Sequence, residues 1–126
     1  MTAESDLHPR RIPGAERAVA DERKFTEYLL NPAHDPDKAR LFAALGFGLD
    51  NWRDLRKTLL DELPRVPGVP KKPMPDGSVN WQADVELSGS EGPTQIRTAW
   101  NLKGGDPPSF ITAYRARGKP ERPKAE

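Results

Sequence analysis

The chain has 126 residues, of which 35% are hydrophobic and 31% charged, with 14 prolines, 10 glycines and no cysteine. This composition excludes a disulfide-stabilised scaffold and a zinc site built from cysteines. No stretch approaches the roughly 18 apolar residues of a membrane-spanning helix, and no apolar run follows Met1 as in a secretory leader. We therefore expect a cytoplasmic protein without membrane contacts.

The net charge of +1 is unevenly distributed along the chain. Residues 115–126 hold five basic and two acidic side chains, which leaves the remainder at −2. We expect flexible tails at 1–11 and 116–126 around one domain at 12–115. A domain that grips phosphates usually carries its basic excess on the folded part. A basic tail can touch nucleic acid weakly, but a solvated terminus is the simpler explanation of its charge.

Three helices are predicted between residues 21 and 63. The first begins at Asp21, whose carboxylate suits the positive end of a helix, and ends at Asn31 before a proline. The second has Asp35 as its N-cap, a proline at its first position, and Gly46 as a left-handed C-cap. The third begins near Asp50 and is stopped by Pro64. Its apolar face consists of Trp52, Leu55, Leu59, Leu60 and Leu63.

A proline-rich segment and then a sheet follow the helices. Residues 64–77 contain five prolines and two glycines, and we expect a stiff, extended connector without regular structure. Alternation of apolar and polar residues then predicts strands at 78–87, 96–103 and 109–115, joined by turns at 88–93 and 104–108. Short turns between successive strands require antiparallel pairing.

Burial of the apolar faces decides the architecture. The sheet and the helices each present one apolar face that must be covered. We predict an α+β domain with two or three N-terminal helices packed on one face of a three-stranded, or slightly larger, antiparallel sheet. Trp52, Trp81 and Trp100 fall on apolar faces and are predicted core residues. The other sheet face mixes acidic side chains, Asp84 and Glu86, with basic ones, Arg97 and Lys103, so its charge argues neither for nor against binding of a nucleic acid.

No strong catalytic motif occurs in the chain, and its two histidines cannot assemble a multi-histidine metal site. His34 lies in a short loop between two helices, where an imidazole can act as a general acid or base or simply bond to a neighbour. Lys24 shares a helix face with Tyr28, and Lys38 shares one with Phe42. Such lysines can hold a phosphate, or their stems can cover apolar surface.

The chain resembles a bacterial and phage family known as domain of unknown function 6883. The resemblance covers roughly residues 12–115 and rests on the order and spacing of several short motifs. These are IPGAERAV at 12–19, Lys24, YLLNP at 28–32, His34, Lys38, Phe42, LGF at 45–47, Trp52, Leu55, RTAW at 97–100 and FITAY at 110–114.

The family's layout of N-terminal helices followed by an antiparallel sheet is similar to that of the barnase, colicin and RelE-like ribonuclease toxins. This similarity implies RNA cleavage without a metal or cofactor, in which a base activates the ribose 2′-hydroxyl and cations stabilise the phosphorane. RNA and a cognate inhibitor protein are the implied partners. By position, His34 is the implied acid or base; Lys24, Lys38 and Arg97 are the phosphate-binding cations; Thr98, Thr112 and Tyr114 are donors near the site.

A second hypothesis is a non-enzymatic protein-binding or phage accessory module that uses the exposed sheet face or the proline-rich connector. The two hypotheses differ in whether His34, Lys24, Lys38 and Arg97 converge on one cleft. Thr98 alternates with Trp100 on the inferred core face, which disagrees with a solvent-facing role for its hydroxyl.

Overall fold

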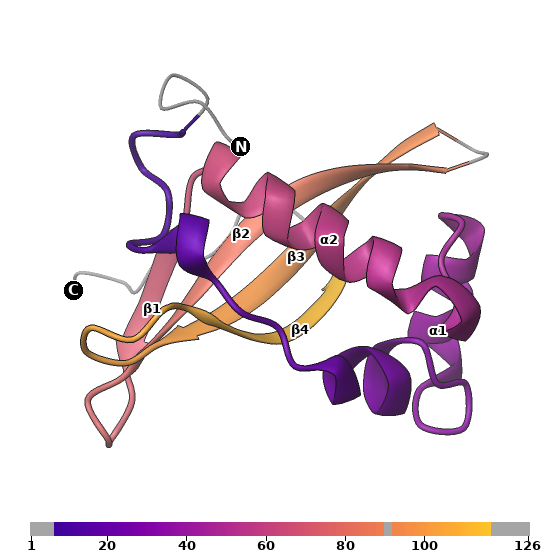
Figure 1. Ribbon diagram of the computed structural model, residues 1–126, viewed down its shortest axis with the longest axis horizontal. Helices are drawn as coiled ribbons and strands as arrows, with labels where there is room; N and C mark the ends of the chain where they lie inside the picture. Colours follow the sequence, from indigo (N-terminus) through magenta and orange to yellow (C-terminus); the bar gives the residue numbers. More distant parts are fainter. Residues whose placement is uncertain (1–6, 90–91, 117–126) are drawn as a thin grey trace.

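The computed structural model describes residues 7–89 and 92–116. Helical segments pack against a four-stranded antiparallel sheet in the order β1-β2-β3-β4, with α2 lying across one face (Figure 1). The strands are β1 (Val69–Pro73), β2 (Val79–Gly89), β3 (Gly92–Leu102) and β4 (Ser109–Arg115). The predicted α+β class is confirmed, with one strand more than the three assigned from the alternation.

The predicted tails at 1–11 and 116–126 lie mostly outside the described residues. Within the described part, His8 N donates to Pro64 O at 2.8 Å and Gly68 N donates to Arg10 O at 2.9 Å. No helix in the described ranges is long and apolar enough to cross a membrane.

The two α-helices begin and end close to where local sequence predicts. In α1 (Pro36–Ala44), Asp35 Oδ1 accepts a hydrogen bond from Lys38 N at 3.0 Å, and Gly46 follows with a φ of +94°. The helix α2 (Trp52–Glu62) follows a 3-10 turn η4 (Leu49–Asn51) and passes into a second one, η5 (Leu63–Arg65). Its inner face buries Trp52, Leu55 and Leu59.

The first helix is wound differently from the other two. Only residues 22–23 have α-helical geometry, and the π-helix η3 (Lys24–Leu29) follows them. Asp21 contributes to its start as predicted, because Asp21 Oδ1 accepts a hydrogen bond from Arg23 N at 2.8 Å. The helix predicted from Asp21 is therefore present, but the sequence pattern does not predict its π-helical winding.

The prediction that residues 64–77 lack regular structure is wrong, because β1 forms there and pairs with β2. Val69 lies opposite Gln82 and Pro70 opposite Trp81, and the register shifts between Pro70 and Pro73. Proline lacks the N–H that a central strand must donate, so it is confined to edge strands and irregular positions. As the first strand in the sheet order, β1 is an edge strand and meets this condition.

The two strands on either side of the turn predicted at 88–93 are longer than expected. Ser88 pairs with Pro93 and Gly89 with Gly92, so β2 and β3 continue to the last described residues on either side of 90–91. Pro93 is tolerated in β3 because β4 pairs with that strand only from Ile96 onward. On this side of β3, Pro93 has no β4 residue opposite it, so the missing proline N–H breaks no hydrogen bond between these two strands.

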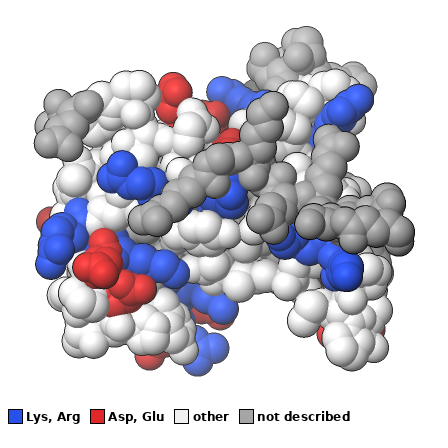
Figure 2. Space-filling view, turned by 180° about the vertical axis from the view of Figure 1, so that it is seen from behind, with Lys and Arg blue, Asp and Glu red and all other residues white. Residues whose placement is uncertain are grey.

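The sheet face turned away from the helices carries polar side chains that bond to one another. Arg97 Nε and Nη2 donate to the carboxylate of Asp84 at 2.9 and 3.1 Å, and the Arg97 side chain is only 8% exposed. Gln82 Nε2 donates to the hydroxyl of Tyr114 at 3.0 Å. On this side of the molecule, basic side chains are interspersed with acidic ones rather than forming one basic field (Figure 2).

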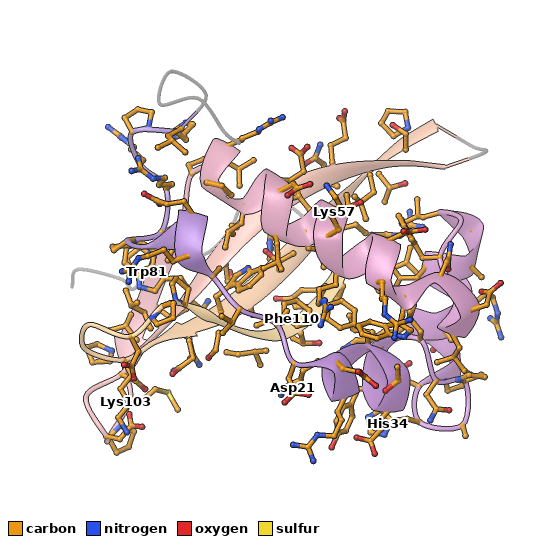
Figure 3. All side chains as sticks on the ribbon, viewed as in Figure 1. Asp21, His34, Lys57, Trp81, Lys103 and Phe110 are labelled. Carbon is orange, nitrogen blue, oxygen red and sulfur yellow. The ribbon has the colours of Figure 1, made fainter. Side chains whose placement is uncertain are left out.

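The core lies between the helices and the other face of the sheet. Phe110 of β4 connects the two layers, with its ring 5.2 Å from that of Phe25 and 5.1 Å from that of Trp100 (Figure 3). Trp52 and Trp100 are buried as predicted, whereas Trp81 is only partly buried at the margin of the core. The aromatic contacts attach η3 firmly to the inner side of β4.

Candidate functional site

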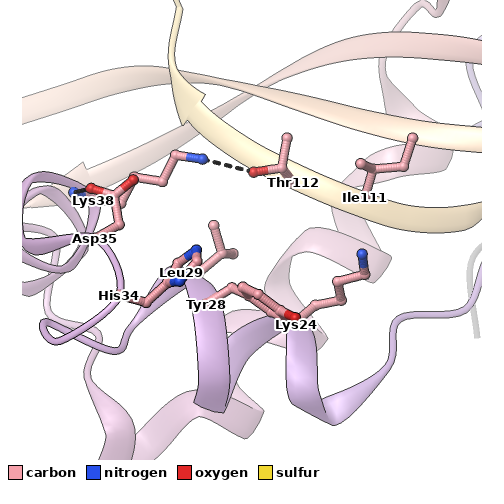
Figure 4. A pocket seen from close by; sticks show the side chains of 8 residues that line it. All are labelled: Lys24, Tyr28, Leu29, His34, Asp35, Lys38, Ile111 and Thr112. Carbon is pink, nitrogen blue, oxygen red and sulfur yellow. Dashed lines mark hydrogen bonds between the residues drawn. The ribbon is translucent and has the colours of Figure 1, made fainter.

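A pocket opens between η3, the loop after it, the first turn of α1 and the edge strand β4 (Figure 4). Its volume is about 140 Å³, below the roughly 300–1,000 Å³ of typical small-molecule sites. The pocket therefore suits one small group of a ligand whose remainder lies outside. It is lined by Lys24, Tyr28, Leu29, His34, Asp35, Lys38, Ile111 and Thr112.

The π-helix forms one wall of this pocket. Leu30 N donates to Phe25 O at 3.0 Å, a hydrogen bond that spans five residues instead of the four of an α-helix. Phe25 and Leu29 are buried in the core, while Lys24 and Tyr28 face the pocket. π-Helical turns are rare and occur frequently at functional sites. The π-helical geometry therefore indicates a functional site here, and it does so independently of which side chains line the pocket.

The loop from η3 to α1 places His34 at the mouth of the pocket. Asn31 organises this loop: its side-chain Oδ1 accepts from Ala33 N at 2.9 Å, and its carbonyl accepts from His34 N at 3.0 Å. The imidazole meets the Tyr28 ring edge to face, with 4.7 Å between the ring centroids. His34 is exposed, so the ring is held in place and still reaches solvent.

Two lysines stand on either side of the pocket, with both ammonium groups turned toward β4 (Figure 4). Lys38 Nζ donates to Thr112 Oγ1 at 2.9 Å, which fixes this ammonium at the sheet edge. Lys24 Nζ lies 5.9 Å from the centroid of the Tyr28 ring. The structure thus brings together four of the residues predicted for the site, from η3, the loop, α1 and β4.

The charge of the pocket favours an anion. Among the described residues of the lining, Asp35 is the one carboxylate against two lysines, and its Oδ1 already accepts the hydrogen bond that caps α1. Within the described ranges, no three His, Cys, Asp or Glu side chains are grouped as metal ligands would be. The prediction that no metal or cofactor takes part stays a prediction.

The other three predicted site residues do not line this pocket. Arg97 lies on the outer face of the sheet, where its guanidinium is held by Asp84. Thr98 is fully buried, and its hydroxyl donates to Ala83 O at 2.6 Å and accepts from Trp100 Nε1 at 2.7 Å. Tyr114 lines an adjoining groove.

Sequence reasoning did not include Tyr28, Leu29, Asp35 or Ile111 in the site, although all four line it. A weak sequence signal existed for Tyr28, which lies four residues from Lys24 and so shares a helix face with it. In the structure Tyr28 is 47% exposed. Asp35 was recognised only as a helix cap. For Ile111 no local signal distinguishes a residue of the pocket from a residue of the core.

Taken together, the fold and the pocket define a small α+β domain with a cationic pocket at the edge of its sheet. The chain belongs to the family described as "Domain of unknown function (DUF6883)", which matches residues 11–117. Comparison with curated proteins and with solved structures finds no match to this chain.

Proposed function

We propose that this protein is a metal-independent ribonuclease that acts at the pocket between η3, α1 and β4. The observation that carries the proposal is the convergence of His34 with two lysines from different segments on a space sized for one phosphate group. An imidazole beside two ammonium groups supplies a proton acceptor and a phosphate clamp, the two requirements for cleaving RNA through its own 2′-hydroxyl.

The clamp comes from Lys24 and Lys38. Each ammonium has three N–H donors; Lys38 directs one of them to Thr112 and retains two for a phosphate oxygen. Lys24 contacts the phosphate from the opposite side of the pocket. The negative charge on the phosphate oxygens grows as the phosphorane forms, so both contacts strengthen in the transition state, which is the condition for catalysis.

The reaction then follows from the position of His34. The imidazole removes the proton from the ribose 2′-hydroxyl, and the 2′-oxygen bonds to phosphorus while the bond to the 5′-oxygen breaks. The departing 5′-oxygen takes a proton from the Lys24 ammonium. The products are a 2′,3′-cyclic phosphate and a free 5′-hydroxyl. His34 loses its acquired proton to water and Lys24 regains one, so the protein is restored.

Cleavage of a fluorescently labelled RNA strand in EDTA tests the proposal. We expect His34→Ala to slow cleavage about 10²- to 10⁴-fold, as for loss of a general base, and Lys24→Ala to slow it about 10²- to 10³-fold. His8→Ala and Lys103→Ala remove the same side-chain types elsewhere. Lys103 lies at the opposite end of the molecule from His34 (Figure 3), so both controls should cleave within about twofold of wild type.

Three outcomes would contradict the proposal. Cleavage that disappears in EDTA would show that a metal is needed. His34→Ala protein that cleaves as fast as wild type would remove the proposed base. Wild-type protein that binds RNA without cleaving it would show that the pocket binds phosphate but does not catalyse cleavage. A DNA strand of the same sequence is the matched substrate control, because without a 2′-hydroxyl it should remain intact.

The same activity would make the protein toxic in a bacterial cytoplasm. Induced expression in bacteria should arrest growth and fragment total RNA, and His34→Ala at equal soluble yield should restore both. Normal growth and intact RNA with soluble wild-type protein would contradict the role as a toxin.

A further inference from the structure

A groove adjoins the pocket and shares Lys38 with it. This α1–β4 groove is lined chiefly by Lys38, Arg40, Leu41, Ala44, Tyr114 and Arg115, and its volume is about 490 Å³. We infer that the groove holds the nucleotide next to the scissile phosphate, with its base against the ring of Tyr114. The inference rests on the ribonuclease activity proposed above and deepens it.

The sizes of the two spaces suit this division. At about 140 Å³ the pocket holds no more than a phosphate-sized group. The groove, at about 490 Å³, falls within the roughly 300–1,000 Å³ of sites that enclose a whole small molecule. Because Lys38 borders both spaces, a phosphate held in the pocket is followed directly by a sugar and base in the groove.

The lining of the groove suits a nucleobase. Leu41 and Ala44 supply apolar surface from α1, and Tyr114 supplies an aromatic ring from β4. The ring is held by the hydrogen bond from Gln82 Nε2 to the Tyr114 hydroxyl at 3.0 Å. Proteins bind single-stranded nucleic acid by stacking bases on such rings, and every base offers a face to stack. The groove should therefore require a base without strongly selecting which one.

The rim of the groove suits the next phosphate. Arg40 and Arg115 are exposed there, and among the described residues Asp37 is the one carboxylate of the lining. Arg40 pairs with Asp37 at 3.7 Å, and both side chains are largely exposed, at 79% and 91%. An exposed pair of this kind contributes little, so a phosphate can replace the carboxylate. Cations at the rim with an aromatic ring inside are the combination that single-stranded RNA requires, whereas an acidic protein partner would need only the cations.

A DNA strand that contains one ribonucleotide tests the inference, because only one of its phosphodiesters has a neighbouring 2′-hydroxyl. Abasic sites are placed in turn on either side of that phosphodiester. For wild-type protein we expect an abasic site on one side alone to lower kcat/KM about tenfold, within the range of about 5- to 150-fold for loss of one stacked base. Tyr114→Ala should cleave the base-containing strand about tenfold more slowly and become insensitive to the abasic site.

Tyr114→Phe is the matched control, since it keeps the ring and loses only the hydroxyl. It should remain sensitive to the abasic site, which shows that the ring and not the hydroxyl is responsible for the dependence on the base. Wild-type cleavage that is equally fast with and without the base, or Tyr114→Ala protein that keeps the base dependence, would overturn the inference and leave the ribonuclease proposal intact.

Fluorescence anisotropy of the same strands separates the two proposals if no strand is cleaved. Binding that weakens about tenfold with the abasic site, and only when Tyr114 is present, would support the groove as a base-binding site while the ribonuclease proposal fails. Binding indifferent to both changes would overturn the groove as well.

Discussion

Removing the hydroxyl of Thr98 should destabilise the fold and leave the chemistry of the pocket unchanged. Thr98 is fully buried and its hydroxyl connects Ala83 O to the indole of Trp100, at 2.6 and 2.7 Å. Thr98→Val keeps the shape of the side chain and deletes both hydrogen bonds. The Trp100 N–H then loses this partner in the core, which costs about 1–3 kcal/mol.

The expected loss of unfolding free energy is about 2–4 kcal/mol, because the lost hydrogen bond to Ala83 adds about 1 kcal/mol to the desolvation cost of the indole. Urea unfolding followed by tryptophan fluorescence measures it, and the slope against urea should not change. Thr58→Val is the matched control: its hydroxyl donates to Asp54 O at 2.8 Å on the exposed side of α2. This variant should stay within about 0.5 kcal/mol of wild type.

Two results would refute the reasoning. Thr98→Val protein as stable as wild type would show that the buried hydroxyl contributes nothing. If Thr98→Val protein is folded but cleaves RNA more than tenfold more slowly than wild type, Thr98 takes part in catalysis. A double-mutant cycle with Trp100→Phe should give a coupling energy of about 1–2 kcal/mol, which locates the effect at the Thr98–Trp100 hydrogen bond.

Three further changes have defined outcomes. Thr112→Val removes the hydroxyl that accepts a lysine hydrogen bond at 2.9 Å; RNA cleavage should slow about tenfold, with unfolding free energy within about 0.5 kcal/mol of wild type. Gly89→Ala would place a Cβ 2.7 Å from Ala44 O, and thermal unfolding should show a loss of about 1–3 kcal/mol. The hydrogen bond from Arg11 lowers the pKa of Glu16, so its carboxylate stabilises the fold above the ordinary pKa of 4.5 and this contribution is lost as the pH falls through the folded value. Glu16→Gln should therefore be less stable by under about 1 kcal/mol at pH 7 and equal to wild type in acid, measured by unfolding across pH.

Local signals explain which parts of the fold could be predicted. The ends of α1 depend on Asp35, Pro36 and Gly46, whose effects act within one turn of the helix. Whether prolines permit a strand depends on whether the strand lies at an edge, and this is a property of the whole sheet. The β1 strand was missed for that reason. The winding of η3 is equally non-local, because it accompanies the contact of Phe25 with Phe110.

The residues of the candidate site also divide into those that local sequence signals could predict and those that depend on the whole fold. Lys24, His34 and Lys38 lie within 15 residues, and short connections hold such segments together, so their convergence could be proposed from sequence. The alternation of β3 correctly placed Arg97 on the outer face of the sheet. It did not indicate burial, because that depends on Asp84 lying directly opposite in the register of β2 and β3.

Protection of the sheet edge and phosphate binding both explain lysines beside β4. An exposed edge strand invites pairing with another chain, and lysines beside it are a common safeguard. The start of β4 is already covered, since Val19 O accepts a hydrogen bond from Phe110 N at 2.9 Å, and Lys24 and Lys38 stand beside the next residues. If protection by the two lysines were the whole role of this edge, Lys24→Ala would promote aggregation and His34→Ala would change nothing. Loss of cleavage in monomeric His34→Ala protein therefore separates a catalytic pocket from a protected edge.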